Sequence, residues 1–520
     1  MRRTWARAGI VAVALAVGIT GCTAQSPEPE QTPSESEPSE EAPAPAGGTL
    51  TIGARVDNNS FDPADLEIGN RVQYWQPVYD TLIALDPEAN PQPNLATEWS
   101  YNEDNTVLTL TLRDDVTFTD GEVFDGEAVK ANIEHIKAGT GQNRFMVEPI
   151  EEVVVNSPTE VELHLSEPVP SLVPYLGWVG GVMASPAALA SGTIAQNPVG
   201  SGPYIYAADQ SSPGTEYRYT RNPDYWNASA YPYDEVVVKP INDVTPLLNA
   251  LKTGQINGAL LTPAVAAEAE AGGATVNALS VAWVGFIIAD RQGTMVPELA
   301  DVRVRQALNH AFDKQAMVDF ILQGHGEVTS QLFNVASQAF DESLDDAYSY
   351  DPELAKELMA EAGVDGFEVT VPQWPGPWTD LFPILAAQAA EIGVTINYQQ
   401  VPADQAISSV LSGDYPIAFF PLASATAWQD VQTWITPTAP WNMLGAQDPE
   451  LDALIEKAQF AGEDEQEAAF QEINQWLVDN AWFAPLFRQD QIFGTTPDTE
   501  VTMQAQNAVP SLSSFRPAGS

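Results

Sequence analysis

The residues that most often do chemistry in proteins are scattered along this 520-residue sequence rather than grouped in a motif. Its four histidines lie far apart, at His135, His164, His310 and His325. No HExxH, CxxC, GxSxG or phosphate-loop pattern occurs, and the acidic residues are too numerous for two of them to be singled out as a glycosidase pair. These features predict a non-enzymatic protein with no cofactor and no metal site. A secreted, membrane-tethered glycoside hydrolase is the alternative from another class.

Cys22, the only cysteine, offers its thiol in a context that favours lipidation. Arginines near the N-terminus precede an apolar run at positions 8–19, which is typical of a signal peptide and shorter than the roughly 20 residues that span a membrane. The segment Ile19-Thr20-Gly21-Cys22 is similar to a bacterial lipobox. Residues 1–21 are therefore predicted to be removed, and Cys22 to become a lipidated first residue. The paired arginines leave Sec and twin-arginine export both open.

Residues 22–48 are predicted to form an acidic, disordered tether after the lipidated cysteine. From Ser26 to Gly48 no apolar side chain is larger than alanine, apart from proline, so this stretch cannot offset its ordering entropy by burial. The whole chain has a formal net charge of −50. That charge disfavours nucleic acid as a partner, because phosphate binding needs clustered Lys and Arg. With a single cysteine, the chain has no internal disulfide.

Strand and helix patterns alternate after residue 48 and predict a large α/β protein of two lobes. Apolar and polar side chains alternate at 108–113 and again at 161–166, as in half-buried strands. Asp301, Asp351 and Asp448 each precede an apolar helical pattern and are placed to cap it.

Several blocks, in order, are similar to those of the extracytoplasmic solute-binding proteins that serve oligopeptide, dipeptide and nickel ABC importers. The first four blocks are Pro93–Trp99 (PNLATEW), Leu112–Gly121 (LRDDVTFTDG), Asn197–Tyr204 (NPVGSGPY) and Arg221–Trp226 (RNPDYW). The later blocks are Ala250–Asn257, Asp301–Leu308 and Tyr350–Gly363. Each block alone is moderately specific. Together, behind a lipobox, they make a strong resemblance over about residues 49–493.

The resemblance implies a two-lobed α/β clamshell, periplasmic-binding-protein-like (type II, cluster C), with an extra subdomain in the first lobe. The expected bounds are 49–285 for lobe I, about 86–196 for its subdomain, 286–488 for lobe II and 489–520 for a return to lobe I. The resemblance also implies a monomeric receptor, lipid-anchored at the extracytoplasmic face of the cell membrane. Such a receptor captures a peptide or other small solute and delivers it to an ABC permease and ATPase. An oligosaccharide or a metal chelate remains open as the ligand.

Aromatic side chains in loops near the expected lobe boundary are the best candidates for the ligand pocket. Trp374 and Trp378 follow a strand at 367–371 in a Pro/Gly loop, where they could form a rigid apolar wall or pack over the next helix. Trp428 is a third candidate. The other candidates are Asn58, Asn59, Trp441 and Phe483.

The segment before Trp428 lacks an acid that peptide-binding relatives of this kind carry. Those relatives have a GW pair and then an aspartate that pairs with the free amine of the peptide, whereas this chain has Pro421-Leu422 and no acid before Asp430. An unpaired buried ammonium costs several kcal/mol. Either Asp430 takes the place of this acid through a loop shift, or standard amine-anchored peptide binding is lost. An aromatic, amide-rich, charge-poor pocket would suit a neutral oligosaccharide, and equally an apolar peptide held by its backbone.

Overall fold

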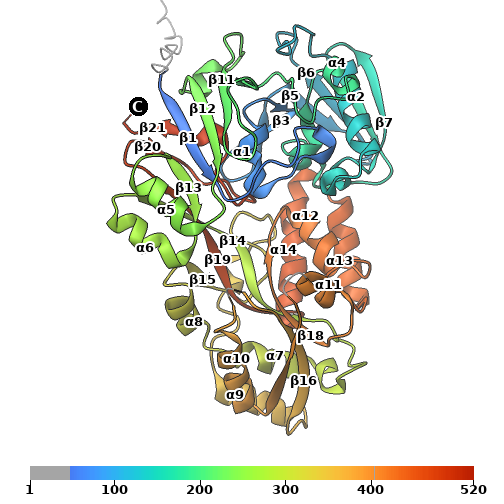
Figure 1. Ribbon diagram of the computed structural model, residues 1–520. Helices are drawn as coiled ribbons and strands as arrows, with labels where there is room; N and C mark the ends of the chain where they lie inside the picture. Colours follow the sequence, from blue (N-terminus) through green and yellow to red (C-terminus); the bar gives the residue numbers. More distant parts are fainter. Residues whose placement is uncertain (1–46, 377, 403–404, 520) are drawn as a thin grey trace, which may run out of the picture. The chain divides into compact units, whose positions relative to one another are not determined.

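The computed structural model describes residues 47–376, 378–402 and 405–519 (Figure 1). The predicted signal peptide, Cys22 and the tether up to residue 46 lie outside these described residues. Among the residues described, no helix combines the length and the apolar character needed to cross a bilayer.

A nine-stranded sheet organises the chain, in the order β10-β11-β12-β1-β13-β19-β14-β18, with β15 also paired to β19. Its strands are β1 Thr49–Ala54, β10 Tyr204–Tyr206, β11 Tyr217–Arg221, β12 Glu235–Pro240, β13 Gly258–Leu261, β14 Thr275–Ile288, β15 Gly326–Val328, β18 Ile417–Ala423 and β19 Ala484–Thr495. Strand β1 is parallel to both of its neighbours, β12 and β13. The run of three valines in β12 is buried, as expected for a strand covered on both faces.

The two longest strands of this sheet, β14 and β19, pair antiparallel from Thr275↔Thr495 to Phe286↔Ala484. Their backbones approach closely at Gly285, where a Cβ atom would lie 2.5 Å from the carbonyl oxygen of Ala484. The expected lobe boundaries at 285/286 and 488/489 fall inside these strands. The paired strands therefore run through both boundaries, with register shifts between Ser280 and Ala282 and between Val284 and Gly285.

A separate antiparallel sheet, in the order β5-β6-β8-β7, lies within residues 86–196. Its elements are β5 Ala96–Tyr101, β6 Val107–Leu112, β7 Ile150–Ser157, β8 Glu160–Leu165 and the adjoining helix α2 Gly126–Ala138. The alternation predicted at 108–113 and 161–166 is confirmed, because the leucines of β6 and the Val and Leu side chains of β8 are buried while their neighbours are not.

A second hydrophobic core surrounds the C-terminal end of β14. It contains side chains from α7 Val302–His310, α9 Pro352–Glu361, β16 Phe367–Gln373, α10 Phe382–Glu391 and β17 Val394–Gln400. Asp301 caps α7 by accepting from the backbone N–H of Arg303, and Asp351 caps α9 by accepting from Leu354, so both predicted caps are confirmed. The chain thus has mixed α/β architecture with distinct cores.

The helices after β18 pack on the N-terminal half of the chain. They are α12 Ala427–Asp430, a π-helical turn Val431–Ile435, α13 Pro449–Phe460 and α14 Glu463–Asp479. The predicted cap Asp448 accepts from the backbone of Glu450 at the start of α13. Buried residues of these helices, Trp428 and Phe470 among them, share one hydrophobic core with the N-terminal sheets.

Short strands form three further two-stranded sheets, β2-β9, β3-β4 and β20-β21. The short strands are β2 Asp80–Thr81, β3 Ile83–Leu85, β4 Pro91–Pro93, β9 Val182–Met183, β20 Thr499–Glu500 and β21 Arg516–Pro517. Further helices are α1 Val72–Trp75, α3 Leu172–Tyr175, α4 Pro186–Ala190, α5 Val244–Lys252, α6 Pro263–Ala271, α8 Lys314–Ile321 and α11 Ala406–Leu411.

Three of the sequence blocks that carry the family resemblance meet at the buried carboxylate of Asp80. Asp80 accepts hydrogen bonds from Ser201 Oγ and the Tyr225 hydroxyl, both at 2.8 Å, and from Trp226 Nε1 at 3.4 Å. The guanidinium of Arg113 lies 4.0 Å from the ring centroid of Trp226. Burial raises the pKa of Asp80 to about 6, against the lowering effect of these donors. These blocks therefore build an internal scaffold contact.

Candidate ligand-binding cavity

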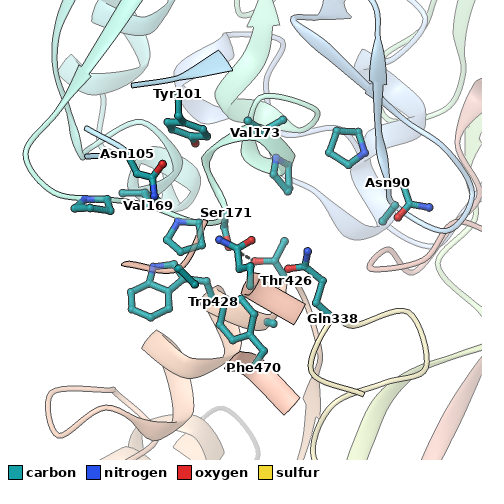
Figure 2. Close-up of a pocket in the computed structure, with 18 of the residues that line it drawn as sticks. Asn90, Tyr101, Asn105, Val169, Ser171, Val173, Gln338, Thr426, Trp428 and Phe470 are labelled. Atoms are coloured by element: carbon teal, nitrogen blue, oxygen red, sulfur yellow. Dashed lines mark hydrogen bonds between the residues drawn. The ribbon is translucent and has the colours of Figure 1, made fainter. Parts of the chain in front are cut away.

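A cavity of about 560 Å³ lies between loops of the N-terminal half and the helices that follow β18 (Figure 2). The N-terminal half lines it with residues from 88–91, 99–105 and 168–174. The C-terminal half lines it with residues from 336–338, 426–428, 459–470 and with Gln506. Its volume is within the range of about 300–1,000 Å³ that is typical of small-molecule sites.

The apolar part of the wall is made of rings. Four aromatic side chains and four prolines line the cavity, namely Trp99, Tyr101, Trp428, Phe470, Pro91, Pro168, Pro170 and Pro174. Rigid rings of this kind give contact area at little cost in conformational entropy. The wall can therefore present flat apolar surfaces to a solute.

The polar part of the wall consists mainly of carboxamides. They are Asn90, Asn102, Asn105, Gln338, Gln459, Gln466 and Gln506. Asn90 bonds to Asp86, Asn102 accepts from the backbone of Thr106, and Gln459 donates to the carbonyl of Pro168.

The other four carboxamides are available for a solute. Within the described part of the chain, the side chains of Asn105, Gln338, Gln466 and Gln506 form no hydrogen bond with protein. Each offers one acceptor and a two-donor amide group. The cavity therefore has spare hydrogen-bonding capacity without charge.

The two sides of the cavity touch through a hydroxyl pair. Ser171, just before α3, shares a hydrogen bond with Thr426, and the dashed line in Figure 2 marks it. Thr426 also caps α12 by accepting from the backbone N–H of Gln429. A second link, 3.4 Å long, joins Gln459 Nε2 to the carbonyl of Pro168. The edge of the cavity is thus closed by a few polar contacts.

Trp428 is the candidate predicted from sequence that lines this cavity. Trp428 lies in the first turn of α12 and is 3 % exposed. Its ring lies beside that of Phe470, with the ring centroids 6.5 Å apart (Figure 2). Its indole Nε1 is buried and has no acceptor among the residues described. A buried donor without a partner is costly, so an acceptor on a bound solute would be favourable here.

Asp430 lies behind this wall, outside the residues that line the cavity in the described structure. It is 2 % exposed, accepts from Ser424 Oγ at 2.6 Å, and accepts from the backbone N–H of Ala425 at 2.9 Å. Burial raises its pKa to about 8 because these two donors compensate only part of the desolvation. Asp430 is therefore placed to hold the loop before α12.

Trp374 and Trp441 belong to a second aromatic group, outside the cavity lining. Both are half-buried and flank Phe420, with ring centroids 5.1 Å and 4.8 Å from it. Trp378 and Phe483 are buried in hydrophobic cores, where Trp378 contacts Phe419 and Phe483 contacts Trp283. In the structure, Trp378 thus packs in a hydrophobic core and is not among the described residues that line the cavity.

The two asparagines after the first strand do not line the cavity either. Asn58 is half-buried in the loop after β1, and its backbone N–H donates to Asp57. Asn59 is exposed and donates from its side chain to Glu67 at 3.1 Å and to the carbonyl of Asp65. Both residues therefore serve a local loop structure here.

Most of the cavity lining was missed by sequence reasoning. Its carboxamides come from separated loops and carry no periodic or motif signal, so only the fold brings them together. The Pro168–Pro170 segment offered one usable signal, because a proline pair between a strand and a helix indicates a rigid surface loop. No cluster of three metal-ligating His, Cys, Asp or Glu side chains is present in the described chain.

A second cavity of about 680 Å³ adjoins the first. The two share four lining residues: Glu88, Asn90, Ala336 and Gln338. These shared residues stand between the cavities. A solute longer than the first cavity could extend past them.

Comparison with known proteins gives a family match over most of the chain. The model of the bacterial extracellular solute-binding proteins, family 5 (middle region), matches residues 90–441. The glutathione-binding protein GsiB of Salmonella paratyphi A is 26 % identical over 336 residues, which are 63 % of this chain and 64 % of that protein. The chain thus spans just under two thirds of the length of this relative.

Solved structures show the fold. HbpA2 from Haemophilus parasuis has a TM-score of 0.80 and 22 % identity, covering 90 % of this chain and 100 % of that one. The periplasmic binding protein DppA from Helicobacter pylori, in complex with the peptide STSA, has a TM-score of 0.71 and 20 % identity, covering 91 % and 98 %. The architecture is therefore the two-lobed α/β clamshell of periplasmic binding proteins.

Proposed function

The chain belongs to family 5 of the bacterial extracellular solute-binding proteins, and on that premise we propose that it is the solute receptor of an ABC importer. It captures a small solute between two lobes and delivers it to a permease driven by an ATPase. The observation that carries the proposal is the cavity of about 560 Å³, whose wall comes from both halves of the chain. Contacts to both sides would favour the closed state of such a receptor over the open one.

In the proposed receptor, residues 49–285 and 489–520 form lobe I, and residues 286–488 form lobe II. Ser171 then belongs to lobe I and Thr426 to lobe II, so their hydrogen bond is a contact of the closed state. This division is supported by the separate hydrophobic core around β16 and β17.

A lipid anchor would keep the receptor at the extracytoplasmic face of the membrane. We assign the anchor to Cys22 and a spacer role to residues 22–48, both on sequence grounds. Bacterial lipoproteins need more than one acyl chain, because a single chain holds a protein only marginally.

The proposal is tested with the purified full-length protein in detergent. Native mass spectrometry identifies any retained ligand, and small-angle scattering follows the radius of gyration as that ligand is removed and returned. We expect the radius to fall on return of the ligand, with the ligand recovered unchanged. Conversion of the ligand to a product would contradict a receptor and support an enzyme.

A further inference from the structure

The cavity wall is almost free of charge. Of the described residues that line it, Glu88 is the one carboxylate, it is exposed, and none is Lys, Arg or His. A free peptide carries an ammonium and a carboxylate, and each would lose its hydration in a closed cavity. Burying such a charge without a partner is strongly unfavourable. The wall therefore discriminates against zwitterionic and anionic solutes.

The buried acid Asp430 does not restore an amine site. The carboxyl group of Asp430 is engaged by Ser424 and Ala425, and Asp430 is not among the described residues that line the cavity. An ammonium group in the cavity would therefore meet carboxamides and hydroxyls but no buried carboxylate.

The same wall fits a solute with flat apolar faces and many hydroxyl groups. The half-buried rings of Trp99 and Tyr101 are the more accessible aromatic surfaces of the wall. Trp428 and Phe470, from α12 and α14, lie side by side and reach the cavity with only a small part of their surface (Figure 2). The unengaged carboxamides of Asn105, Gln338 and Gln466 offer a donor and an acceptor side by side, which matches adjacent hydroxyl pairs. The Trp428 indole N–H is buried and has no acceptor among the described residues, so a hydroxyl oxygen of the solute could serve as its acceptor.

From these observations we infer that the ligand is an uncharged, hydroxyl-rich solute, a neutral oligosaccharide that packs against the aromatic wall at Trp428. This inference rests on the proposed receptor function and names the class of solute. The adjoining cavity, which shares Asn90 and Gln338 with the first, gives room for a chain of more than one sugar ring.

The test is calorimetric titration of the full-length protein with three classes of probe. Maltotriose, cellotriose and xylotriose represent neutral oligosaccharides, tri-alanine and glutathione represent peptides, and nickel–histidine represents chelates. Native mass spectrometry of the protein as purified identifies a retained ligand independently. We expect a neutral saccharide by at least one of these routes, with affinity unchanged between low and high salt.

Two substitutions separate the roles of the Trp428 ring and its N–H group. Trp428→Phe keeps a ring but removes the donor, and should weaken saccharide binding about fivefold. Trp428→Ala removes both and should weaken it about thirtyfold or more. Trp283→Phe is the matched control, because Trp283 also has a buried Nε1 without an acceptor but lies outside the cavity. The control should leave binding unchanged.

The outcomes distinguish the ligand class from the receptor function. A retained or bound solute that carries an amine or a carboxylate would overturn the saccharide inference and leave the receptor function standing. Saccharide binding that is equally affected by Trp428→Phe and Trp283→Phe would overturn the assigned role of Trp428. A protein that neither retains nor binds any solute would overturn both proposals.

Discussion

Two buried carboxyl groups show how their surroundings set the protonation of single residues. Asp80 and Asp430 are both nearly inaccessible, and burial raises the pKa of each. Asp80 has three donors and the charge of Arg113 to stabilise its anion, and its pKa reaches about 6. Asp430 has two donors to set against its burial, and its pKa reaches about 8. Asp430 is therefore mainly protonated at neutral pH.

Replacing Asp430 with Asn should change how stability depends on pH. The pKa of Asp430 is about 8 in the folded state and about 4 in the unfolded chain, so the folded protein holds the extra proton between these values. Its contribution to stability is complete below about pH 4 and is lost as the pH rises to about 8. The free energy of unfolding of the wild type should fall relative to Asp430→Asn by up to about 1.4 kcal/mol per pH unit in that window. Denaturant titrations at pH 5 and pH 8 measure this, and parallel pH profiles would refute it.

The Asp80 contact should stabilise the fold through Tyr225. Tyr225→Phe removes a 2.8 Å hydrogen bond to a buried carboxylate and should lower the free energy of unfolding by about 1–3 kcal/mol. Tyr219→Phe is the matched control, since the hydroxyl of Tyr219 is buried without a hydrogen-bond partner among the described residues. Thermal or denaturant unfolding of both variants measures the difference. Equal losses in the two variants would contradict a specific role for the Asp80 contact.

At the scale of elements, local sequence signals predicted the helix caps well, but they did not predict the surroundings of the aromatic side chains. The caps at Asp301, Asp351 and Asp448 are confirmed because capping depends on a few neighbouring residues. Trp378 and Trp428 have similar sequence surroundings, each in a loop after a strand. Both are buried in hydrophobic cores, but only Trp428 also borders the cavity among the described residues, because the outcome depends on which distant elements cover the ring. A linear sequence carries no signal for that.

The close approach of β14 and β19 should make Gly285 intolerant of a side chain. A Cβ atom there would lie 2.5 Å from the carbonyl oxygen of Ala484 and 2.7 Å from Cα of Pro485, both backbone atoms that cannot swing away. Gly285→Ala should therefore lower the free energy of unfolding by about 3 kcal/mol. Gly47→Ala, where a Cβ meets nothing within 4 Å, should change it by a few tenths of a kcal/mol at most. Denaturant unfolding compares them, and similar stabilities would show that the strands can separate locally.

At the scale of the whole molecule, the family resemblance predicted the architecture, but the cavity lining could not be predicted. The lining joins Asn105, Gln338 and Gln506, which lie on segments more than a hundred residues apart. Each is an ordinary surface amide when its own segment is considered alone. Their meeting follows from the packing of α12, α13 and α14 on the N-terminal half.

Membrane attachment should depend on Cys22. Cys22→Ser removes the thiol that would be acylated, so the protein should move from the membrane fraction to the soluble fraction of the cell envelope and lose incorporation of radiolabelled palmitate. Ser26→Ala, four residues further along the same segment, should behave like the wild type. Fractionation and labelling measure both effects. Continued membrane association of Cys22→Ser would contradict a lipid anchor.

The pairing of β14 with β19 across both proposed lobe boundaries has a mechanical consequence for the proposed receptor. A clamshell joined by slack loops would swing freely, whereas a hydrogen-bonded ribbon resists torsion and returns to its resting twist. Each closure would twist this pair of strands away from its resting twist, and release of the solute would let the pair return to it. Amide protons along the ribbon should then exchange slowly in both states, while the Ser171–Thr426 edge makes and breaks its contact in every transport cycle.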